Sequence, residues 1–236
     1  MKLSPRSSLR RTATIIVGLL LTAVVQAQDL DAATATACPG LAAWARLHSS
    51  TAKFIAESPV TGTDAVLEAQ LHNMVAEDQQ ARQAWIAGGM THPDPIVFNH
   101  VQVVDLRDVK ALHQMLDAGG VPTPERVGRQ GMNDFWLLVQ HADTDVPLQE
   151  QVLKALSAEG SGVPRGDIAM LTDRIRGHHG LPELYGSGFH LSGTQMVPNP
   201  IEDEAHVDER RAKMDMPPLA DYACALRLAY KVPPAK

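Results

Sequence analysis

The sequence lacks most of the motifs by which an activity is recognised. Aromatic residues make up 4% of its 236 residues, and it holds only two cysteines. It contains no Cys-x-x-Cys and no His-Glu-x-x-His, the common zinc signatures. It also has no glycine-rich phosphate or dinucleotide loop and no Gly-x-Ser-x-Gly elbow. The sequence therefore predicts no cofactor and no metal site.

The first 27 residues have the layout of a secretory signal peptide. Four basic residues precede an apolar, uncharged run over residues 12–25, and small residues at 25 and 27 suit cleavage before Gln28. The run is short for a permanent membrane span, which needs about 20 residues. We expect residues 1–27 to be removed and the protein to be exported, periplasmic or secreted, with no membrane span left.

Charge and cysteine content restrict the partners. Removing residues 1–27 takes away four basic and no acidic residues, so the net charge falls from -6 to −10. An acidic surface argues against nucleic acid and anionic lipid. In an oxidising compartment Cys38 and Cys224 are a candidate disulfide, and two separate buried thiols are the equal alternative. The partners that remain are a small polar ligand or another exported protein.

The composition and the apolar periodicity predict an all-α fold. We expect a flexible N-terminus over residues 28–39, one helical domain over residues 40–230 and a tail over residues 231–236. The domain is predicted to be a bundle of about seven helices. Glycines and prolines make residues 181–200 a long irregular loop.

Apolar spacing and capping residues place the individual helices. The expected N-caps are Thr63 or Asp64, Asp105 and Asp167, and Asp145 is expected to start another helix. Residues 96–104 fit either a strand or a helix. The predicted helices cover residues 40–57, 64–88, 105–117, 132–141, 145–158, 167–179, 202–214 and 218–230.

Two charged residues interrupt the apolar face of the helix expected over residues 64–88. Steps of three and four along that face pass through Leu67, Leu71, Met74, Asp78, Arg82 and Trp85. Asp78 and Arg82 are four residues apart, close enough to pair. A chain retains such a buried pair either to fix helix packing or to build a site. The spacing alone favours a role of the pair in helix packing over a role in a site.

His141 and Asp143 are the candidate catalytic residues. His141 leaves the apolar surface at the end of the expected central helix, where Asp143 is placed to orient its imidazole for general-base catalysis. The alternative is a histidine that only compensates the helix dipole. The candidate ligand-binding residues are Asp78, Arg82, Asp173, Arg174, Tyr185 and His190.

Several short strings in the chain occur together in one family: Leu138-Val139-Gln140-His141-Ala142-Asp143, Leu171-Thr172-Asp173-Arg174, Leu184-Tyr185-Gly186 and Pro200-Ile201-Glu202-Asp203. On these strings the chain, from Leu67 to Tyr222, resembles the uncharacterised bacterial domain of unknown function 6624 family. The family's tyrosine string usually has a Gln before it and a Thr after it, whereas Glu183 and Ser187 stand here. The resemblance implies no activity, but it implies a shared pattern that includes Asp78, Arg82, His141, Asp143, Asp173, Arg174 and Tyr185.

These residues suggest a polar pocket inside a helical domain. In this hypothesis the pairs Asp78–Arg82 and Asp173–Arg174 converge on His141 and bind a small polar ligand or a partner without catalysis. The alternative is an exported hydrolase that uses His141 as acid and base, because water is the main co-reactant available without a cofactor. If neither holds, the charges form an internal network that fixes the register of the helices.

Overall fold

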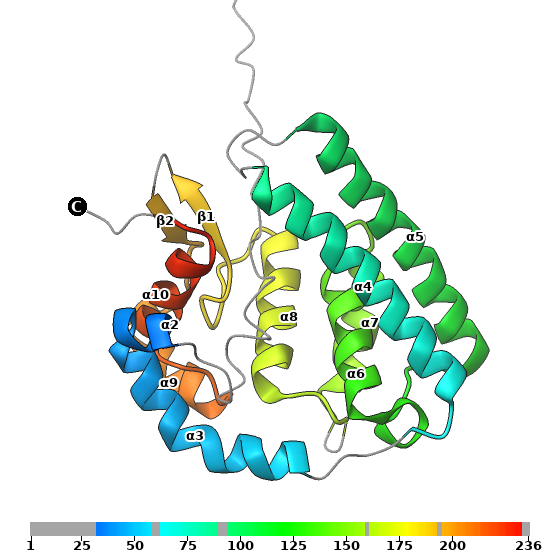
Figure 1. Cartoon of the computed structure of the whole chain (residues 1–236), viewed down its shortest axis with the longest axis horizontal. Coiled ribbons are helices and arrows are strands. Elements are labelled where there is room, and N and C mark those ends of the chain that lie inside the picture. Colours follow the sequence, from blue (N-terminus) through cyan, green and yellow to red (C-terminus); the bar gives the residue numbers. More distant parts are fainter. Residues whose placement is uncertain (1–31, 58–61, 89–93, 159–160, 193–194, 233–236) are drawn as a thin grey trace, which may run out of the picture.

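The fold is built almost entirely from α-helices (Figure 1). The computed structural model describes residues 32–57, 62–88, 94–158, 161–192 and 195–232, so the expected signal peptide lies outside the described residues. These ranges hold nine α-helices, which confirms the all-α class with more helices than predicted. They are α2 (Ala32–Ala37), α3 (Pro39–Glu57), α4 (Ala65–Ala87), α5 (Pro95–Gly119), α6 (Pro124–Gln140), α7 (Val146–Leu156), α8 (Arg165–His178), α9 (Val207–Lys213) and α10 (Leu219–Ala229).

The centre of the larger helix group, α4 to α8, is α6 (Figure 1). Phe135 and Trp136 in α6 are fully buried, as the nearly continuous apolar stretch predicts. The indole nitrogen of Trp136 donates a hydrogen bond to the carbonyl oxygen of Asp167 in α8, at 3.0 Å. This bond satisfies the one polar atom of a large buried side chain and ties α6 to α8.

The beginnings of α4 and α6 are fixed against each other. Asp64, one of the two candidate caps, is the residue that caps α4, because its side chain accepts a hydrogen bond from the backbone nitrogen of Leu67 at 3.0 Å. The backbone nitrogen of Asp64 donates to the carbonyl oxygen of Arg126 in α6, at 2.8 Å. Just beyond that contact the helical path of α6 breaks at Gly128, whose φ of 67° favours glycine.

A smaller group lies on the opposite side of α8 and consists of α2, α3, α9, α10 and a two-stranded hairpin (Figure 1). Strands β1 (Phe189–Ser192) and β2 (Gln195–Pro198) pair antiparallel. A 3₁₀ turn, η1 (Glu204–His206), precedes α9. The disulfide between Cys38 and Cys224 joins the start of α3 to α10, so a bonded pair replaces the alternative of two separate thiols.

The predicted N-caps at Asp105 and Asp167 are wrong, because Asp105 lies in the middle of α5 and Asp167 in the first turn of α8, whose N-cap is Pro164. Helix α5 begins ten residues before Asp105, where the side chain of Asp94 accepts a hydrogen bond from the backbone nitrogen of Ile96 at 2.8 Å. Residues 96–104 are therefore helical, and two of their valines share a buried cluster with Trp85 of α4. The valine-rich segment allowed a strand or a helix, and the burial of these valines against α4 favours the helix.

The expected irregular loop over residues 181–200 contains regular structure, namely the hairpin of β1 and β2. Phe189 and Met196, one from each strand, are buried against the α10 group. The glycine and proline content of this segment predicted only an irregular loop. It concealed two four-residue strands, which are too short to give a clear alternating pattern.

The two ends of the domain also differ from expectation. Residues 28–39, expected to be flexible, include α2, and Cys38 is buried beside α10. The disulfide explains this order, since it fastens the segment to the domain. Residues 202–214, expected as one surface helix, form η1 and α9, with Arg211 fully buried. None of the described helices is long and apolar enough to cross a membrane.

The disulfide predicts a large dependence of stability on redox state. Cys38 and Cys224 are 186 residues apart, a loop for which the chain-entropy model gives about 5 kcal/mol as an upper value. We expect the Cys38→Ser, Cys224→Ser double variant to have a lower free energy of unfolding, measured by denaturant titration. A reducing agent should lower the stability of the natural chain and leave that of the double variant unchanged. Equal stability of both proteins under oxidising conditions would contradict the disulfide.

Candidate functional site

The charged pair predicted on the apolar face of α4 is buried and bonded. Asp78 is 1% exposed and Arg82 is 6% exposed. The Nε of Arg82 lies 3.0 Å from Oδ1 of Asp78, and the side-chain amide of Gln79 donates to Oδ2 of Asp78 at 2.9 Å. Two charges removed from water in this way are costly unless further partners satisfy them. Those partners come from α5 and from the end of α6.

His141 caps the C-terminal end of α6 and points at this pair. Its Nδ1 lies 2.9 Å from both carboxylate oxygens of Asp78 and 3.0 Å from Nε of Arg82. The contacts of Nδ1 with Asp78 and with Arg82 cannot both be hydrogen bonds. A protonated Nδ1 donates to the carboxylate and cannot accept from the guanidinium. Asp78 has a lowered pKa, since His141 and Arg82 outweigh the effect of burial, so it is an ionised acceptor. The network therefore assigns the proton to Nδ1, donated to Asp78.

This assignment leaves Nε2 of His141 as a buried lone pair. Among the described residues Nε2 has no hydrogen-bond partner. Burial, and then the charge of Arg82, lower the pKa of His141 to about 4 against the opposing effect of Asp78. The imidazole is consequently neutral at neutral pH, and its only free polar atom is a hydrogen-bond acceptor.

Asp105 completes the cluster from α5, and the sequence prediction missed this role. Its carboxylate accepts a hydrogen bond from Nη2 of Arg82. Burial raises the pKa of Asp105 to about 7, and the charges of Asp78 and Asp143 add to the rise although Arg82 opposes it. Its spacing offered a signal, since Asp105 follows the buried Val101 by one helical turn.

Asp143 forms a second ion pair next to the first. Arg174 of α8 donates to it with both Nε and Nη2, each at 2.6 Å, and Nε2 of His178 lies 3.0 Å away. Although burial alone would raise it, Arg174 and His178 hold the pKa of Asp143 well below its usual range. Asp143 therefore orients Arg174. The group that orients His141 is Asp78, from 63 residues earlier in the chain.

The two ion pairs share one electrostatic environment. Arg174 contributes to the lowered pKa of His141, and Asp143 contributes to the raised pKa of Asp105. The most deeply buried members are Asp78, His141 and Arg174, whose side chains are 1%, 2% and 3% exposed. Asp143 is 40% exposed, so water reaches the cluster from its side. We call the six residues Asp78, Arg82, Asp105, His141, Asp143 and Arg174 the polar cluster.

The polar cluster lies within the part of the chain that a family model covers. The model of a family of unknown function (DUF6624) matches residues 65–233, from the first residue of α4 to beyond α10. The chain belongs to the DUF6624 family. No curated protein and no solved structure matches it. In this DUF6624 protein α2 and α3 precede the match, and the disulfide joins them to it.

Asp173, predicted to bind ligand, is fully used in anchoring a loop of the DUF6624 domain. Its carboxylate accepts hydrogen bonds from the backbone nitrogens of Leu184, Tyr185 and Ser187 at 2.7–3.2 Å, and from the hydroxyl of Ser187 at 2.9 Å. Burial raises the pKa of Asp173 although these bonds oppose the rise. Asp173 and Arg174 are adjacent in α8, so their side chains point to different sides of the helix.

Tyr185 and His190 belong to the same loop and hairpin. The carbonyl oxygen of Tyr185 accepts a hydrogen bond from Nη1 of Arg211 at 2.6 Å, and this guanidinium lies 4.7 Å from the ring centre of Tyr222. Nδ1 of His190 lies 3.1 Å from the side-chain oxygen of Asn199. In the described ranges these polar contacts do not reach His141, although the Tyr185 side chain packs against the core of the larger helix group. No group of residues there has the composition and spacing of a metal site.

The hydrogen bonds of Asp173 predict that its replacement lowers the stability of the protein and leaves the polar cluster unchanged. Asp173→Asn keeps the size of the side chain but removes an ionised acceptor from several buried donors. We expect a loss of at least about 3 kcal/mol in the free energy of unfolding, with faster proteolysis within residues 183–188. The exposed Asp117→Asn removes the same charge and should change neither quantity. A stable, protease-resistant Asp173→Asn protein would contradict the anchor.

The buried imidazole predicts an unusual titration. Nitrogen-detected NMR should find His141 protonated on Nδ1, with a lone pair on Nε2, and still neutral at pH 6. The folded pKa of about 4 is below the unfolded value, so the unfolded state binds the proton first as the pH falls. His141 therefore lowers the stability as the pH drops from about 6.5 to about 4. Titration of His141 near 6.5 would refute the burial argument.

Proposed function

We propose that this DUF6624 protein is exported and binds a small polar ligand at the polar cluster. The observation that carries the proposal is a pair of buried atoms without partners in the described chain, Nε2 of His141 and Nη1 of Arg174. One is an acceptor and the other is a donor. A buried polar atom without a partner costs about 1–3 kcal/mol, and each such atom in a native protein calls for an explanation.

The two free atoms define the chemistry of the ligand. Arg174 already holds Asp143 with Nε and Nη2, so its remaining Nη1 is the donor left for an oxygen of the ligand. His141 offers a lone pair to a hydroxyl or an amine. A hydroxylated or amino-bearing carboxylate of low molecular mass meets both requirements. The partly exposed Asp143 marks the side from which such a molecule would enter.

Export is supported by two independent features. The signal-like segment over residues 1–27 predicts secretion. The disulfide between Cys38 and Cys224 is a bond that persists in oxidising compartments and is rare in the cytosol. A ligand of the polar cluster would then be a compound found outside the cytoplasm.

A second candidate function is hydrolysis, and the Asp78–His141 geometry favours it. A neutral imidazole whose Nδ1 proton is held by a carboxylate presents Nε2 as a general base, the arrangement found in hydrolytic triads. Burial raises the pKa of Asp105 to about 7, so near neutral pH Asp105 is able to donate a proton to a leaving group. In this reading the ligand bound at Nε2 is the attacking water.

One screen tests both functions. Hydroxy acids, amino acids and their esters are added to the natural protein, to His141→Gln and to His179→Gln, and the unfolding temperature is measured. His179 is an exposed histidine at the end of α8, so its replacement is the matched control. We expect a compound that stabilises the first and third proteins, by about 2.7 kcal/mol at 100 times Kd, and at least tenfold weaker binding to His141→Gln.

The same samples separate binding from catalysis. Release of acid from an ester by the natural protein and by His179→Gln, with none from His141→Gln, would establish the hydrolase. Stabilisation without turnover would establish a binding protein. If all three proteins respond alike to every compound, the polar cluster is only a packing device and the proposal fails.

A further inference from the structure

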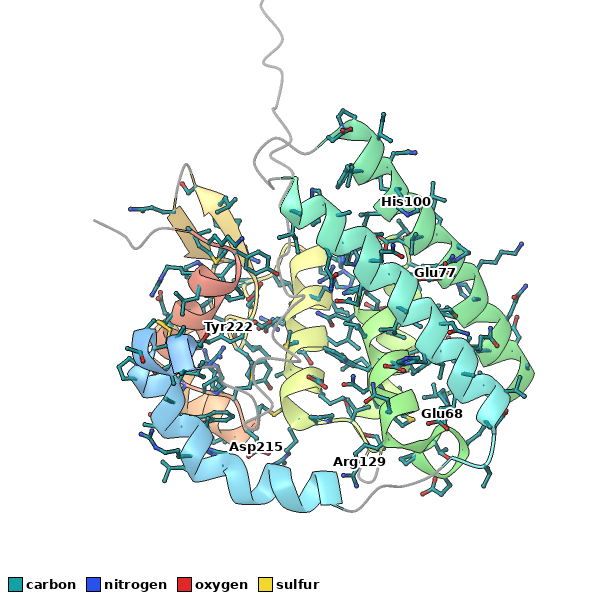
Figure 2. The ribbon with its side chains drawn as sticks, in the orientation of Figure 1. Glu68, Glu77, His100, Arg129, Asp215 and Tyr222 are labelled. Carbon is teal, nitrogen blue, oxygen red and sulfur yellow. A yellow bond between two sulfur atoms is a disulfide. The ribbon has the colours of Figure 1, made fainter. Side chains whose placement is uncertain are left out.

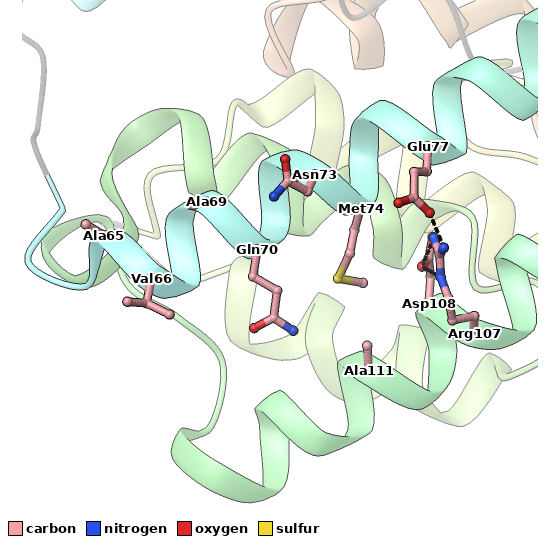
Figure 3. A pocket seen from close by; sticks show the side chains of 10 residues that line it. All are labelled: Ala65, Val66, Ala69, Gln70, Asn73, Met74, Glu77, Arg107, Asp108 and Ala111. Atoms are coloured by element: carbon pink, nitrogen blue, oxygen red, sulfur yellow. Dashed lines mark hydrogen bonds and ion pairs between the residues drawn. The ribbon is translucent and has the colours of Figure 1, made fainter.

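A groove separates α4 from α5 on the outer surface of the larger helix group (Figure 3). Its volume is about 710 Å³, within the range of small-molecule sites. It extends from the start of α4 to Glu77, twelve residues along the helix, which corresponds to about 18 Å. The lining side chains are Ala65, Val66, Ala69, Gln70, Asn73, Met74 and Glu77 from α4, and Arg107, Asp108 and Ala111 from α5.

Asp108 is the unusual member of this lining. It is 4% exposed, whereas the other polar lining residues are exposed. Its Oδ1 accepts from Nε and Nη2 of Arg107 at 3.1 and 2.9 Å, and Figure 3 shows the two side chains together. Its Oδ2 is buried and has no hydrogen-bond partner among the described residues. A residue that lines the groove thus has a buried carboxylate oxygen without a donor, and a ligand in the groove could supply that donor.

We propose that the α4–α5 groove binds an elongated organic cation, an aliphatic amine whose ammonium group donates to Oδ2 of Asp108. The site uses neither His141 nor Arg174, so it is independent of the function proposed above.

The charges around Asp108 favour a cation over a neutral donor. Arg107 also pairs with Glu77, so its single positive charge faces two carboxylates and the groove keeps a net negative charge. Asp78, on the inner side of α4, adds to the negative field, because its charge contributes to the raised pKa of Asp108. An ammonium group at Oδ2 would relieve this excess of negative charge.

The rest of the groove suits an aliphatic body. Val66, Ala69, Met74 and Ala111 supply apolar surface along its length. Gln70 and Asn73 lie between them on the exposed side, and their carbonyl oxygens accept hydrogen bonds from a second amine. A linear diamine therefore matches the groove better than a compact or aromatic cation.

Calorimetric titration of the disulfide-bonded chain with 1,5-diaminopentane at low salt tests the proposal. We expect saturable binding, with shifts of the side-chain amide signals of Gln70 and Asn73 in the NMR spectrum. Pentan-1-ol, which has the aliphatic body without the charge, should bind at least tenfold more weakly. Absence of saturation at tens of millimolar diamine, or equal binding of the alcohol, would overturn the site.

Variants locate the binding. Asp108→Asn should weaken the affinity for the diamine at least tenfold. Glu150→Gln, which removes the same charge from the exposed face of α7, should leave it within twofold. Ala69→Leu fills the groove from an exposed helical position and should also weaken binding tenfold, a test that remains valid if Asp108→Asn does not fold. Unchanged affinity in Ala69→Leu would place the diamine elsewhere and refute the proposal.

Discussion

The larger helix group depends on the burial of Arg82, one cation shared by three elements. Its guanidinium donates to Asp78 within α4 and to Asp105 in α5, and Asp78 in turn accepts the Nδ1 proton of His141 at the end of α6. A guanidinium removed from water is tolerated only where its donors are met, so the three elements must keep one mutual register. The same requirement explains why α4 holds two charges on a face that otherwise carries Leu, Met and Trp. Whatever the polar cluster binds, its geometry is held by this shared cation.

Helix α8 lies between the two helix groups (Figure 2). Two adjacent residues of α8 connect these groups. Arg174 binds Asp143, at the end of the α6 region, and Asp173 binds the backbone of the 184–187 loop on the other side. Arg211 and Tyr222, from α9 and α10, then hold the carbonyl oxygens of that loop. The loop is consequently fixed at both its nitrogens and its oxygens. Replacing Asp173 should therefore disturb the hairpin side, and replacing Arg174 should disturb the polar cluster.

Sequence reasoning succeeded where the signal is local and failed where a partner is remote. The aspartates before α4 and α7 cap those helices because the capping bond reaches only three residues, as Asp64 to Leu67 and Asp145 to Leu148 show. Asp105 has the same local appearance, but α5 begins earlier and its carboxylate pairs with Arg82, 23 residues away. Asp78 was correctly placed on a buried face. That it, and not the neighbouring Asp143, orients His141 depends on a contact across 63 residues that no local pattern encodes.

Three acids lie along the seam where α4 packs against α5, namely Asp78, Asp105 and Asp108. Their pKa values differ because few positive charges lie near them. Asp78 accepts hydrogen bonds from Arg82 and from the neutral His141 and has a lowered pKa, whereas the pKa values of Asp105 and Asp108 rise to about 7 and about 6. Burial is the first cause of both rises, and the charge of Asp78 adds to each. Ionising one acid therefore makes the next harder to ionise along the seam. Adding positive charge on either side of α4 relieves the same repulsion, so the polar cluster and the groove share one electrostatic origin while presenting different free atoms.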